Sequence, residues 1–405
     1  MDPWVYWRDI LGSPKTVLAP MVDASELAYR LLCRKYGCDL AFTPMYHSGL
    51  FSKLSGYRNT NFQTCDDDKP LILQFCGNNP EVILQASKYI DNKVQGIDLN
   101  FGCPQNIAKR GHYGAFLLEE PELMESLVSK LVNSDLKCPV SCKIRLVCKN
   151  DLQKTINIMY RLEQAGISML TVHGRTLKDK GTLTGSCDWE SLKIMKQRCN
   201  IPFIANGGIH TFEDIQKCFD YTGADAVMSA EGILEDPWLF YRFKNNQNIN
   251  RPSQFDLVGE YIDVCKKYPP PNNSIVRSHL YRIFHTILNT PGANKFRDKI
   301  NVAKDLNDFK IFSQELYHFF INLQNKFHKD IPQVGFWYIR HRIDRLEKQV
   351  SKDLISLYRQ ENIPLPRTLQ KETQRYQNKQ DDCQGISMNN PLFSSISQST
   401  LLYNM

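Results

Sequence analysis

The stretch from residue 100 to residue 116, NFGCPQNIAKRGHYGAF, places a thiol, several cations and three glycines in one short segment. Cys103 comes just after a run that has the composition of a buried strand, so its side chain can face a ligand at the strand end. A thiol in such a position can act as a nucleophile, a redox partner or a proton donor. Because no second cysteine stands close by in the sequence, the proton donor is the role we favour.

Other strand-like runs also end in polar side chains. Lys143 ends one of them, and a buried lysine needs an anionic partner, such as an electron-rich flavin ring. Gln74 offers a donor and an acceptor to the amide edge of a ring, and His173 can bind either a ring or a phosphate. These residue types together predict a bound phosphorylated cofactor.

The tripeptide NGG at residues 206–208 has the composition of a phosphate cradle. Glycines let backbone N–H groups approach an anion, and a helix that we expect to begin near Thr211 would add a favourable dipole. A last strand-like run ends at Ala230 and Glu231, and in (β/α)8 barrels the loops after the last two strands commonly bind phosphate.

The elements that must position these groups alternate regularly over the first 240 residues. Continuous apolar strands that alternate with amphipathic helices are typical of a parallel sheet covered on both faces. Eight such units favour a closed (β/α)8 TIM barrel over an open sheet, with the active site at the carboxyl ends of the strands. The expected strands are 16–20, 39–43, 71–75, 96–100, 140–144, 168–172, 202–206 and 225–229, and the expected helices include 80–90, 121–133, 151–165 and 211–220.

Composition restricts the class of protein further. Thirteen cysteines, an odd number with no C-x-x-C pair, indicate a reduced cytoplasmic or nuclear protein without a zinc site. No apolar run is long enough for a membrane span, and the first residues lack the apolar core of a secretory signal. Residues 1–250 carry 28 Lys and Arg against 28 Asp and Glu, whereas residues 251–405 carry 22 against 15. The basic second part indicates either a polyanionic partner or a basic solvated face.

The strand–helix alternation stops near residue 250. Helical spacing continues over 256–267, 274–290 and 309–326, and a basic helix is expected at 338–350. The residues beyond are rich in Gln, Asn and Ser. We therefore predict a barrel domain over 1–245, a small helical domain over 246–350 and a disordered tail over 351–405.

Six segments resemble, in order, the motifs of the tRNA-dihydrouridine synthase family: LAPMVD, LILQFCGN, DLNFGCPQNIAKRGHYGAFL, CKIRL, TVHGRT and IANGGI. The third is similar to the eukaryotic branch that modifies positions 16 and 17 of the D-loop. The resemblance implies an FMN-dependent barrel that reduces uridine in tRNA to 5,6-dihydrouridine with electrons from NADPH or NADH. It also implies that Cys103 protonates C5 after hydride transfer to C6, and that the helical domain binds tRNA. We expect a monomer that needs no metal.

The resemblance also carries site residues over to this chain. Glu231 stands where many bacterial members have an arginine, so only backbone N–H groups are expected to bind phosphate there. Lys109 to Gly114 are expected to form a mobile cationic flap with glycine hinges. Two helices either present candidate tRNA contacts or are solvated on these faces: one carries Arg277, Tyr281, Arg282 and His285, and the other carries Arg340, His341, Arg342 and Arg345. The implied FMN contacts are Pro20, Met21, Val22, Gln74, Lys143, His173, Asn206, Gly207, Gly208, Ala230 and Glu231, and the substrate contacts are Asn100, Lys109, Arg110, His112, Arg145 and Arg175.

Two alternatives stay open. One is an FMN barrel that acts on a free pyrimidine, as dihydroorotate and dihydropyrimidine dehydrogenases do; such an enzyme does not need a basic helical region. The other is a catalytically idle RNA-binding barrel, against which the presence of Cys103, Lys143 and His173 argues.

Overall fold

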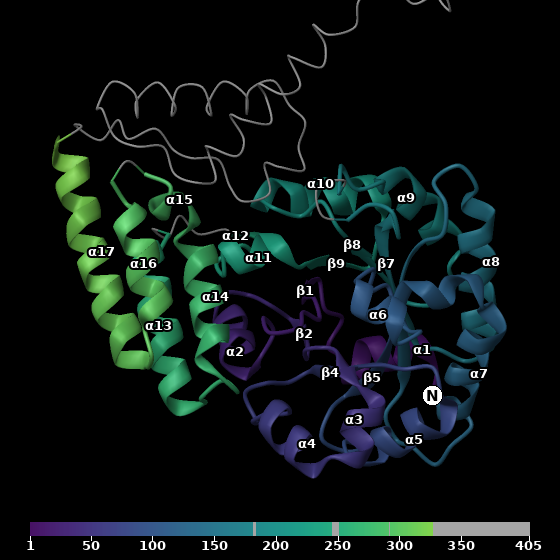
Figure 1. The fold of residues 1–405 in the computed structure, drawn as a ribbon. Helices are drawn as coiled ribbons and strands as arrows, with labels where there is room; N and C mark the ends of the chain where they lie inside the picture. The colour runs from purple at the N-terminus through teal and green to yellow at the C-terminus, as the bar shows by residue number, and fades with distance from the viewer. Residues whose placement is uncertain (181–183, 245–250, 291, 327–405) are drawn as a thin grey trace, which may run out of the picture.

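The computed structural model describes residues 1–180, 184–244, 251–290 and 292–326; Figure 1 shows a unit of strands and helices beside a group of helices. Eight parallel strands close into a ring. The strand order is β2-β1-β9-β8-β7-β6-β5-β4, and a pairing of β2 with β4 closes the barrel. All eight predicted strands and the (β/α)8 fold are confirmed. The strands are β1 (Thr16–Leu18), β2 (Leu40–Phe42), β4 (Leu71–Cys76), β5 (Gly96–Phe101), β6 (Val140–Leu146), β7 (Met169–Thr176), β8 (Phe203–Asn206) and β9 (Ala226–Ser229); the short β3 (Tyr46–His47), not predicted, pairs with β4.

Helices cover the outside of the barrel and lie between its strands in the chain. The predicted N-cap at Thr211 is present, in a capping box with Asp214. The barrel helices are α2 (Leu27–Lys35), α3 (Ser48–Lys53), α4 (Ser55–Asn61), α5 (Pro80–Lys88), α6 (Asn106–Arg110), α7 (Pro121–Val132), α8 (Leu152–Gln164), α9 (Trp189–Arg198), α10 (Phe212–Thr222), α11 (Glu231–Glu235) and α12 (Tyr241–Lys244).

The amino-terminal segment fills one end of the barrel. After the short helix α1 (Pro3–Val5), a π-helical turn from Tyr6 to Ile10 buries Tyr6 and Trp7. These rings pack against Val17 and Ile72 inside the barrel. Because this end is filled with apolar side chains, polar chemistry is left to the opposite end, where the strands terminate.

A separate group of helices, green in Figure 1, follows the barrel: α13 (Gln254–Lys267), α14 (Asn273–Ile283), α15 (His285–Leu288), α16 (Asn294–Val302) and α17 (Leu306–Lys326). The prediction of one helix over 274–290 is wrong, because the helix is interrupted at Phe284, between α14 and α15. Helix α16 was missed, since its polar sequence hides the two residues that it buries, Phe296 and Ile300. The basic helix expected at 338–350 and the tail at 351–405 lie outside the described residues.

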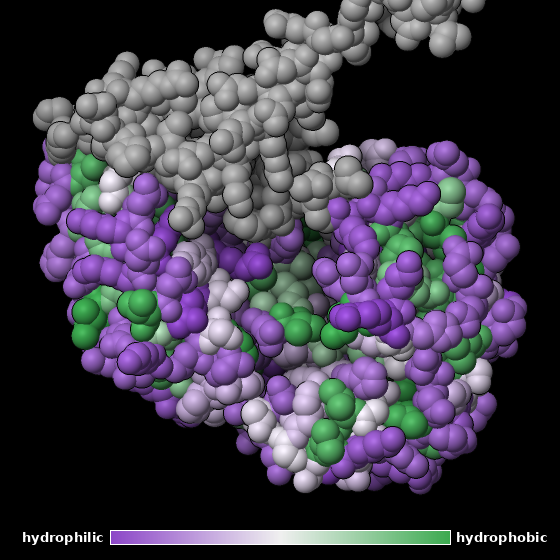
Figure 2. Space-filling view, in the orientation of Figure 1, coloured by the Kyte–Doolittle hydropathy of each residue, from purple (hydrophilic) through white to green (hydrophobic). Residues whose placement is uncertain are grey.

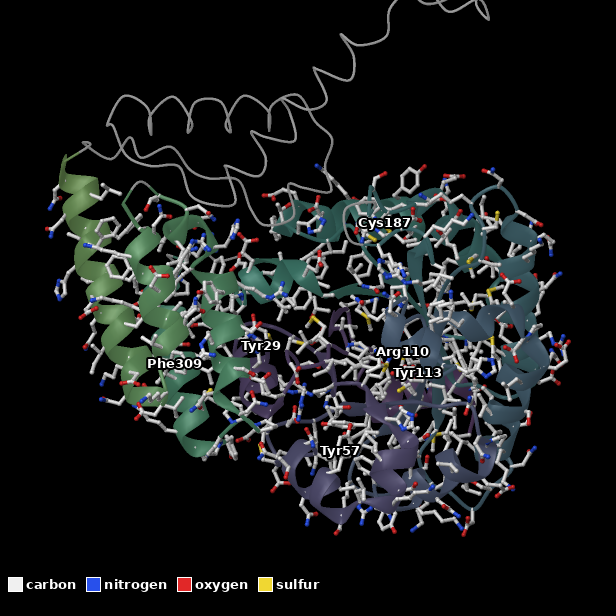
Figure 3. All side chains as sticks on the ribbon, in the orientation of Figure 1. Tyr29, Tyr57, Arg110, Tyr113, Cys187 and Phe309 are labelled. Carbon is white, nitrogen blue, oxygen red and sulfur yellow. The ribbon has the colours of Figure 1, made fainter. Side chains whose placement is uncertain are left out.

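Buried polar side chains link α2 and the residue before it to these helices and to a loop of the barrel; we call Glu26, Arg30, Asp68 and His279 the junction cluster. Glu26 precedes α2 and accepts hydrogen bonds from Tyr261 of α13 (2.7 Å) and from His279 of α14 (3.0 Å). The His279 ring stacks on Tyr29 of α2 at 3.9 Å, and Figure 3 shows Tyr29 where α2 meets the helical group. Arg30 of α2 pairs with Asp68 at 2.6 Å, with both side chains almost fully buried.

Candidate active site

A cavity of about 420 Å³ lies at the carboxyl ends of the strands. Its volume is in the range of small-molecule sites, about 300–1,000 Å³. In Figure 2 the face in view is hollowed near its centre, with apolar residues in the hollow and hydrophilic residues around it. The predicted site residues that line the cavity are Pro20, Met21, Val22, Gln74, Asn100, Cys103, Lys143, Arg145, His173, Arg175, Asn206, Gly207, Gly208, Ala230 and Glu231. Their roles toward a cofactor or substrate stay predictions.

Lys109, Arg110 and His112 do not line this cavity. They lie on α6 and the turn after it, with exposed side chains, and His112 Nε2 lies 2.5 Å from Glu120 Oε1. Gly114, expected to be a hinge, instead serves close packing: its φ is +70°, and a Cβ atom there would lie 2.7 Å from the carbonyl oxygen of Cys103. The segment is thus folded back against the cysteine loop.

Tertiary structure adds residues that sequence reasoning missed. Met45 and Lys180 also line the cavity, and Lys180 Nζ donates to the carbonyl of Pro104 at 2.8 Å, which tethers the residue after Cys103. Cys76 and Cys103 belong to one apolar cluster with Tyr113, although 27 positions separate the two thiols in the chain. No local pattern marks Lys180, because it stands in a polar loop.

Three buried cations and a histidine gather on β6 and β7; we call Lys143, Arg145, His173 and Arg175 the mouth cluster. Burial, followed by repulsion from Arg145, lowers the pKa of Lys143 to about 7. Burial and then Arg175 lower the pKa of Arg145 to about 10. The arginines donate to backbone carbonyls, Arg145 to Gly102 at 2.7 Å and Arg175 to Gly185, and the nearby Asp179 pairs with Lys149 instead. Positive charge therefore accumulates here without a carboxylate in ion-pair contact among the described residues.

His173 is held in its neutral form. Burial lowers its pKa well below the ordinary value, and the neighbouring Arg145 and Lys143 lower it further. Its Nε2 atom lies 3.1 Å from Nη1 of Arg175. Since a guanidinium can only donate, Nε2 must accept, and the ring proton resides on Nδ1.

The two glycines after β8 adopt backbone conformations that would be strained for other residues. Gly207 and Gly208 have φ values of +109° and +78°, and a Cβ atom on Gly207 would lie 2.8 Å from the sulfur of Cys187, which is labelled in Figure 3. The start of α10 already holds a carboxylate. The Asp214 carboxylate already accepts from the N–H groups of His210 and Thr211, so this helix start carries its own anion. The cavity is lined both by the segment before α10, as far as His210, and by Ala230–Gly232.

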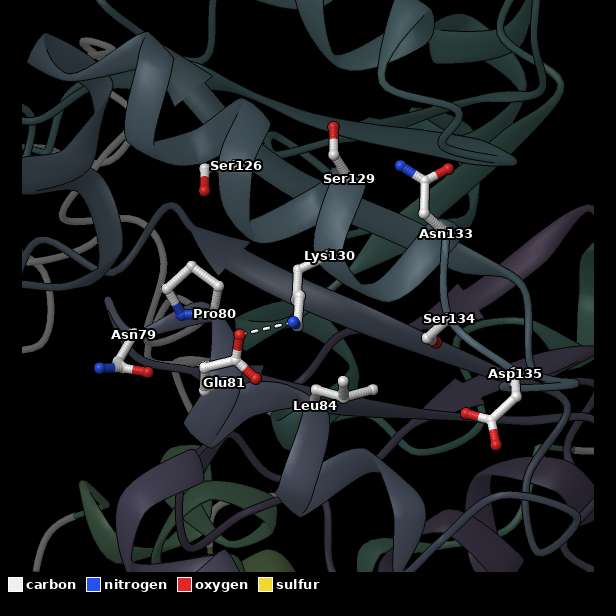
Figure 4. A pocket seen from close by; sticks show the side chains of 10 residues that line it. All are labelled: Asn79, Pro80, Glu81, Leu84, Ser126, Ser129, Lys130, Asn133, Ser134 and Asp135. Carbon is white, nitrogen blue, oxygen red and sulfur yellow. Dashed lines mark ion pairs between the residues drawn. The ribbon is translucent and has the colours of Figure 1, made fainter.

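A larger hollow, of about 750 Å³, lies on the outer face of the barrel between α5 and α7 (Figure 4). It is lined mostly by small polar side chains, and its cation, Lys130, pairs with Glu81 at 2.5 Å. Its other carboxylate, Asp135, lies 3.8 Å from Lys88. Each charge thus has an opposite charge nearby, which makes the hollow a poor candidate for chemistry.

None of the described helices is both long and apolar enough to cross a membrane. Among the described residues, three or more His, Cys, Asp or Glu side chains do not come together as a metal site would require.

Fold and site together define a (β/α)8 barrel protein whose mouth combines buried cations with a glycine cradle. The chain belongs to the dihydrouridine synthase family: the family described as Dihydrouridine synthase (Dus) matches residues 17–324.

Named relatives agree with this assignment. Over 313 residues the chain is 42% identical to a Mus musculus protein whose name describes it as similar to the NAD(P)(+)-dependent tRNA-dihydrouridine(16/17) synthase. This match covers 77% of this chain and 63% of the mouse protein. The tRNA-dihydrouridine(16/17) synthase of Saccharomyces cerevisiae is 43% identical over 291 residues (69% and 67% covered). A Homo sapiens protein named as like the 20a/20b synthase is 40% identical over 263 residues (64% and 79% covered). The chain thus spans just under two thirds of the mouse relative.

Proposed function

We propose that the protein reduces uridine to 5,6-dihydrouridine at positions 16 and 17 of tRNA, with FMN as cofactor and NADPH or NADH as electron source. The observation that carries the proposal is Cys103 in a cation-rich barrel cavity of a dihydrouridine synthase family member. The 16/17 relatives align over more of this chain than the 20a/20b relative does, which favours those positions. We further propose that the protein acts as a monomer without a metal, in the cytoplasm or nucleus.

The residues present fit FMN. Among the described residues the mouth cluster lacks an ion-paired anion, which a phosphate or an electron-rich ring would supply, and Gly207 of the cradle has no room for a Cβ atom. Gln74 and Asn100 offer amide groups to a ring edge. We assign the ring to Pro20–Val22, Gln74, Lys143 and His173, and the phosphate to 206–208 with Ala230 and Glu231. Bound FMN supplies the hydride for C6 of uracil.

Cys103 would complete the reduction by giving a proton to C5. A C=C bond that receives a hydride at one carbon needs a proton at the other, and a neutral thiol within reach can give it. The thiol is partly accessible, and its loop is held by Asn100, whose Oδ1 accepts the N–H of Cys103 at 2.9 Å. The protein's part is therefore to bind, orient and protonate.

The helical region is our candidate for the tRNA contact. A hollow of about 480 Å³ on α14 is lined by Arg277, Tyr281, Arg282, His285 and Arg297. Arg277 is also anchored, since it donates to the carbonyls of Ile300 and Ala303. Lys109 and Arg110 are exposed on α6, which begins one residue after the cavity-lining Gln105, and they add basic character that suits the phosphates of a folded RNA.

The decisive experiment combines cofactor identification with mapping. FMN should be released from the denatured purified protein, and NADPH with unmodified tRNA should yield dihydrouridine at positions 16 and 17. A tRNA with cytidine at both positions and free uridine serve as controls. Equal reduction of free uridine would favour the free-pyrimidine enzyme, whereas a colourless protein that binds tRNA would favour the idle barrel; either result would sink the proposal.

A further inference from the structure

A fully buried carboxylate beneath the cavity starts a chain of hydrogen bonds that ends on the Cys103 loop. Asp98 Oδ2 accepts from Gln74 Nε2 at 2.8 Å, and Gln74 Oε1 accepts from Asn100 Nδ2 at 2.8 Å. Asn100 Oδ1 then accepts two backbone N–H groups, of Cys103 at 2.9 Å and of Gly102 at 3.1 Å. We call Asp98, Gln74 and Asn100 the amide relay.

The barrel's register places the three side chains in a row. Gln74 of β4 lies directly opposite Asp98 of β5. Asp98 and Asn100 are two residues apart on β5 and therefore share a face of the sheet. Asp98 does not line the cavity, whereas Gln74 and Asn100 do, so its hydrogen-bonded path to the cavity runs through them, beside its charge interaction with the buried Lys143.

The two ends of the relay determine how both amides point. Backbone N–H groups can only donate, so Asn100 must present its oxygen to the Cys103 loop and its nitrogen to Gln74. An ionised carboxylate can only accept, so Gln74 must turn its nitrogen toward Asp98. Each amide keeps one N–H group outside the relay, which suits the carbonyl groups of a ring bound in the cavity.

We propose that Asp98 is a positioning residue that, through Gln74 and Asn100, sets the polarity of the cavity floor and holds the loop of Cys103. The inference rests on the proposed function for its catalytic consequence. Without an acceptor at position 98, Gln74 is free to rotate, and a reversed Gln74 would set its nitrogen against that of Asn100. Two donors face to face repel, and the disturbance passes to the cysteine loop.

Three substitutions separate this role from simpler ones. Asp98→Leu removes the acceptor at similar size. Asp98→Asn removes the charge but keeps an oxygen that can accept from Gln74. The new N–H group of the asparagine can donate to Ser141 Oγ, because the Ser141 hydroxyl proton can instead point to the carbonyl of Ile97. Ser141→Ala is the matched control: it removes the 2.7 Å bond to Asp98 Oδ1 and leaves the relay intact.

We expect Asp98→Leu to lower kcat for dihydrouridine formation about 10- to 100-fold, with KM for tRNA nearly unchanged, because misplacement of reacting groups acts on the chemical step. The Kd for FMN should rise several-fold in the same variant. Asp98→Asn should restore both values to within about threefold of the wild type, and Ser141→Ala should never leave that range. An Asp98→Asn variant as impaired as Asp98→Leu would show that charge matters and not the relay, and an active Asp98→Leu would overturn the inference outright.

A second measurement does not depend on the proposed activity. In FMN-free protein the rate of Cys103 alkylation by iodoacetamide, followed by peptide mapping, should change at least threefold in Asp98→Leu and not in Asp98→Asn. If Asp98→Leu does not fold, Gln74→Glu can replace it, because this variant places two carboxylates against each other. The double variant Gln74→Glu with Asp98→Asn again pairs a donor amide with an acceptor carboxylate, and it should restore the wild-type rate of Cys103 alkylation. Absence of FMN and activity in the wild type would sink the proposed function, whereas an unchanged alkylation rate in every variant would sink the relay.

Discussion

The molecule buries two clusters of charge that are built in opposite ways. In the junction cluster each buried carboxylate meets a side-chain partner: Glu26 faces His279, and Asp68 faces Arg30. Although burial opposes ionisation of Glu26, the neighbouring His279 brings the pKa of the carboxyl below its ordinary value. In the mouth cluster, by contrast, no carboxylate among the described residues forms an ion pair with a cation: Arg145 and Arg175 donate to backbone carbonyls, and Arg175 Nη1 also donates to His173.

The contrast distinguishes structural charge from functional charge. Two buried groups that pair with each other connect two parts of a fold and need no ligand. Buried cations without an anion are costly, and they persist where a ligand completes them. Changes at the junction should therefore act on stability, and changes at the mouth on ligand binding and chemistry.

The strongest test of the comparison is Cys103→Ala. Loss of the proton donor should lower dihydrouridine formation about 10²- to 10⁴-fold, while FMN binding and the unfolding midpoint stay unchanged. Single-turnover assays with pre-reduced enzyme measure the chemical step. Cys65→Ala, which changes a half-buried thiol outside the cavity, is the control. Full activity of Cys103→Ala would remove the cysteine from the mechanism.

At the junction, Asp68→Ala should act on stability. It removes the partner of Arg30 and also of Arg34, whose Nε lies 3.1 Å from Asp68 Oδ1. Breaking a buried ion pair typically costs about 3–5 kcal/mol. Urea unfolding measures the loss, and Asp66→Ala, at a fully exposed carboxylate, should change stability by less than about 0.5 kcal/mol. An equally stable Asp68→Ala would contradict the comparison.

Lys143 sharpens the comparison through pH. Its pKa is lowered from 10.5 to about 7 in the folded protein, so between these values the unfolded chain binds one more proton. The stability of FMN-free protein should therefore rise with pH above 7, by about 1.4 kcal/mol per pH unit from this group. Lys143→Met should lack that rise, be more stable near pH 7 and bind FMN more weakly. Parallel stability curves for the two proteins from pH 7 to 9 would refute the prediction.

The smallest expected effect belongs to the exposed cations of α6. The double variant Lys109→Ala with Arg110→Ala should leave stability within about 0.5 kcal/mol and FMN affinity unchanged. Its tRNA affinity should fall, and the slope of log K against log salt should decrease by about one to two. Lys130→Ala, in the outer hollow of Figure 4, is the control. A slope equal to that of the wild type would exclude a phosphate contact at α6.

Much of the fold was predictable because its signals are local. Apolar runs of strand length, separated by amphipathic segments, indicated every strand of the barrel. A capping box is likewise readable, since Thr211 and Asp214 stand three residues apart. Helix α16 was not predicted because it has few apolar residues. The interruption of the helix at Phe284 was not predicted because no Gly or Pro stands there.

Site residues were predictable to the extent that they end strands. Barrel geometry brings all strand ends to one face, so Gln74, Lys143 and His173 could be grouped before any contact was known. The flap was different: Lys109 and Arg110 are close to Cys103 in sequence, but the helix α6 directs them away from the cavity lining.

By itself, the sequence determined the barrel, the strand-end chemistry and the family, because each is written in short-range pattern. Only the tertiary structure decided which charges are paired. His279 meets Glu26 across 253 positions, and Asp98 reaches Cys103 through Gln74 on another strand. Such contacts depend on barrel closure, register and helix packing, which act over distances that no local periodicity records.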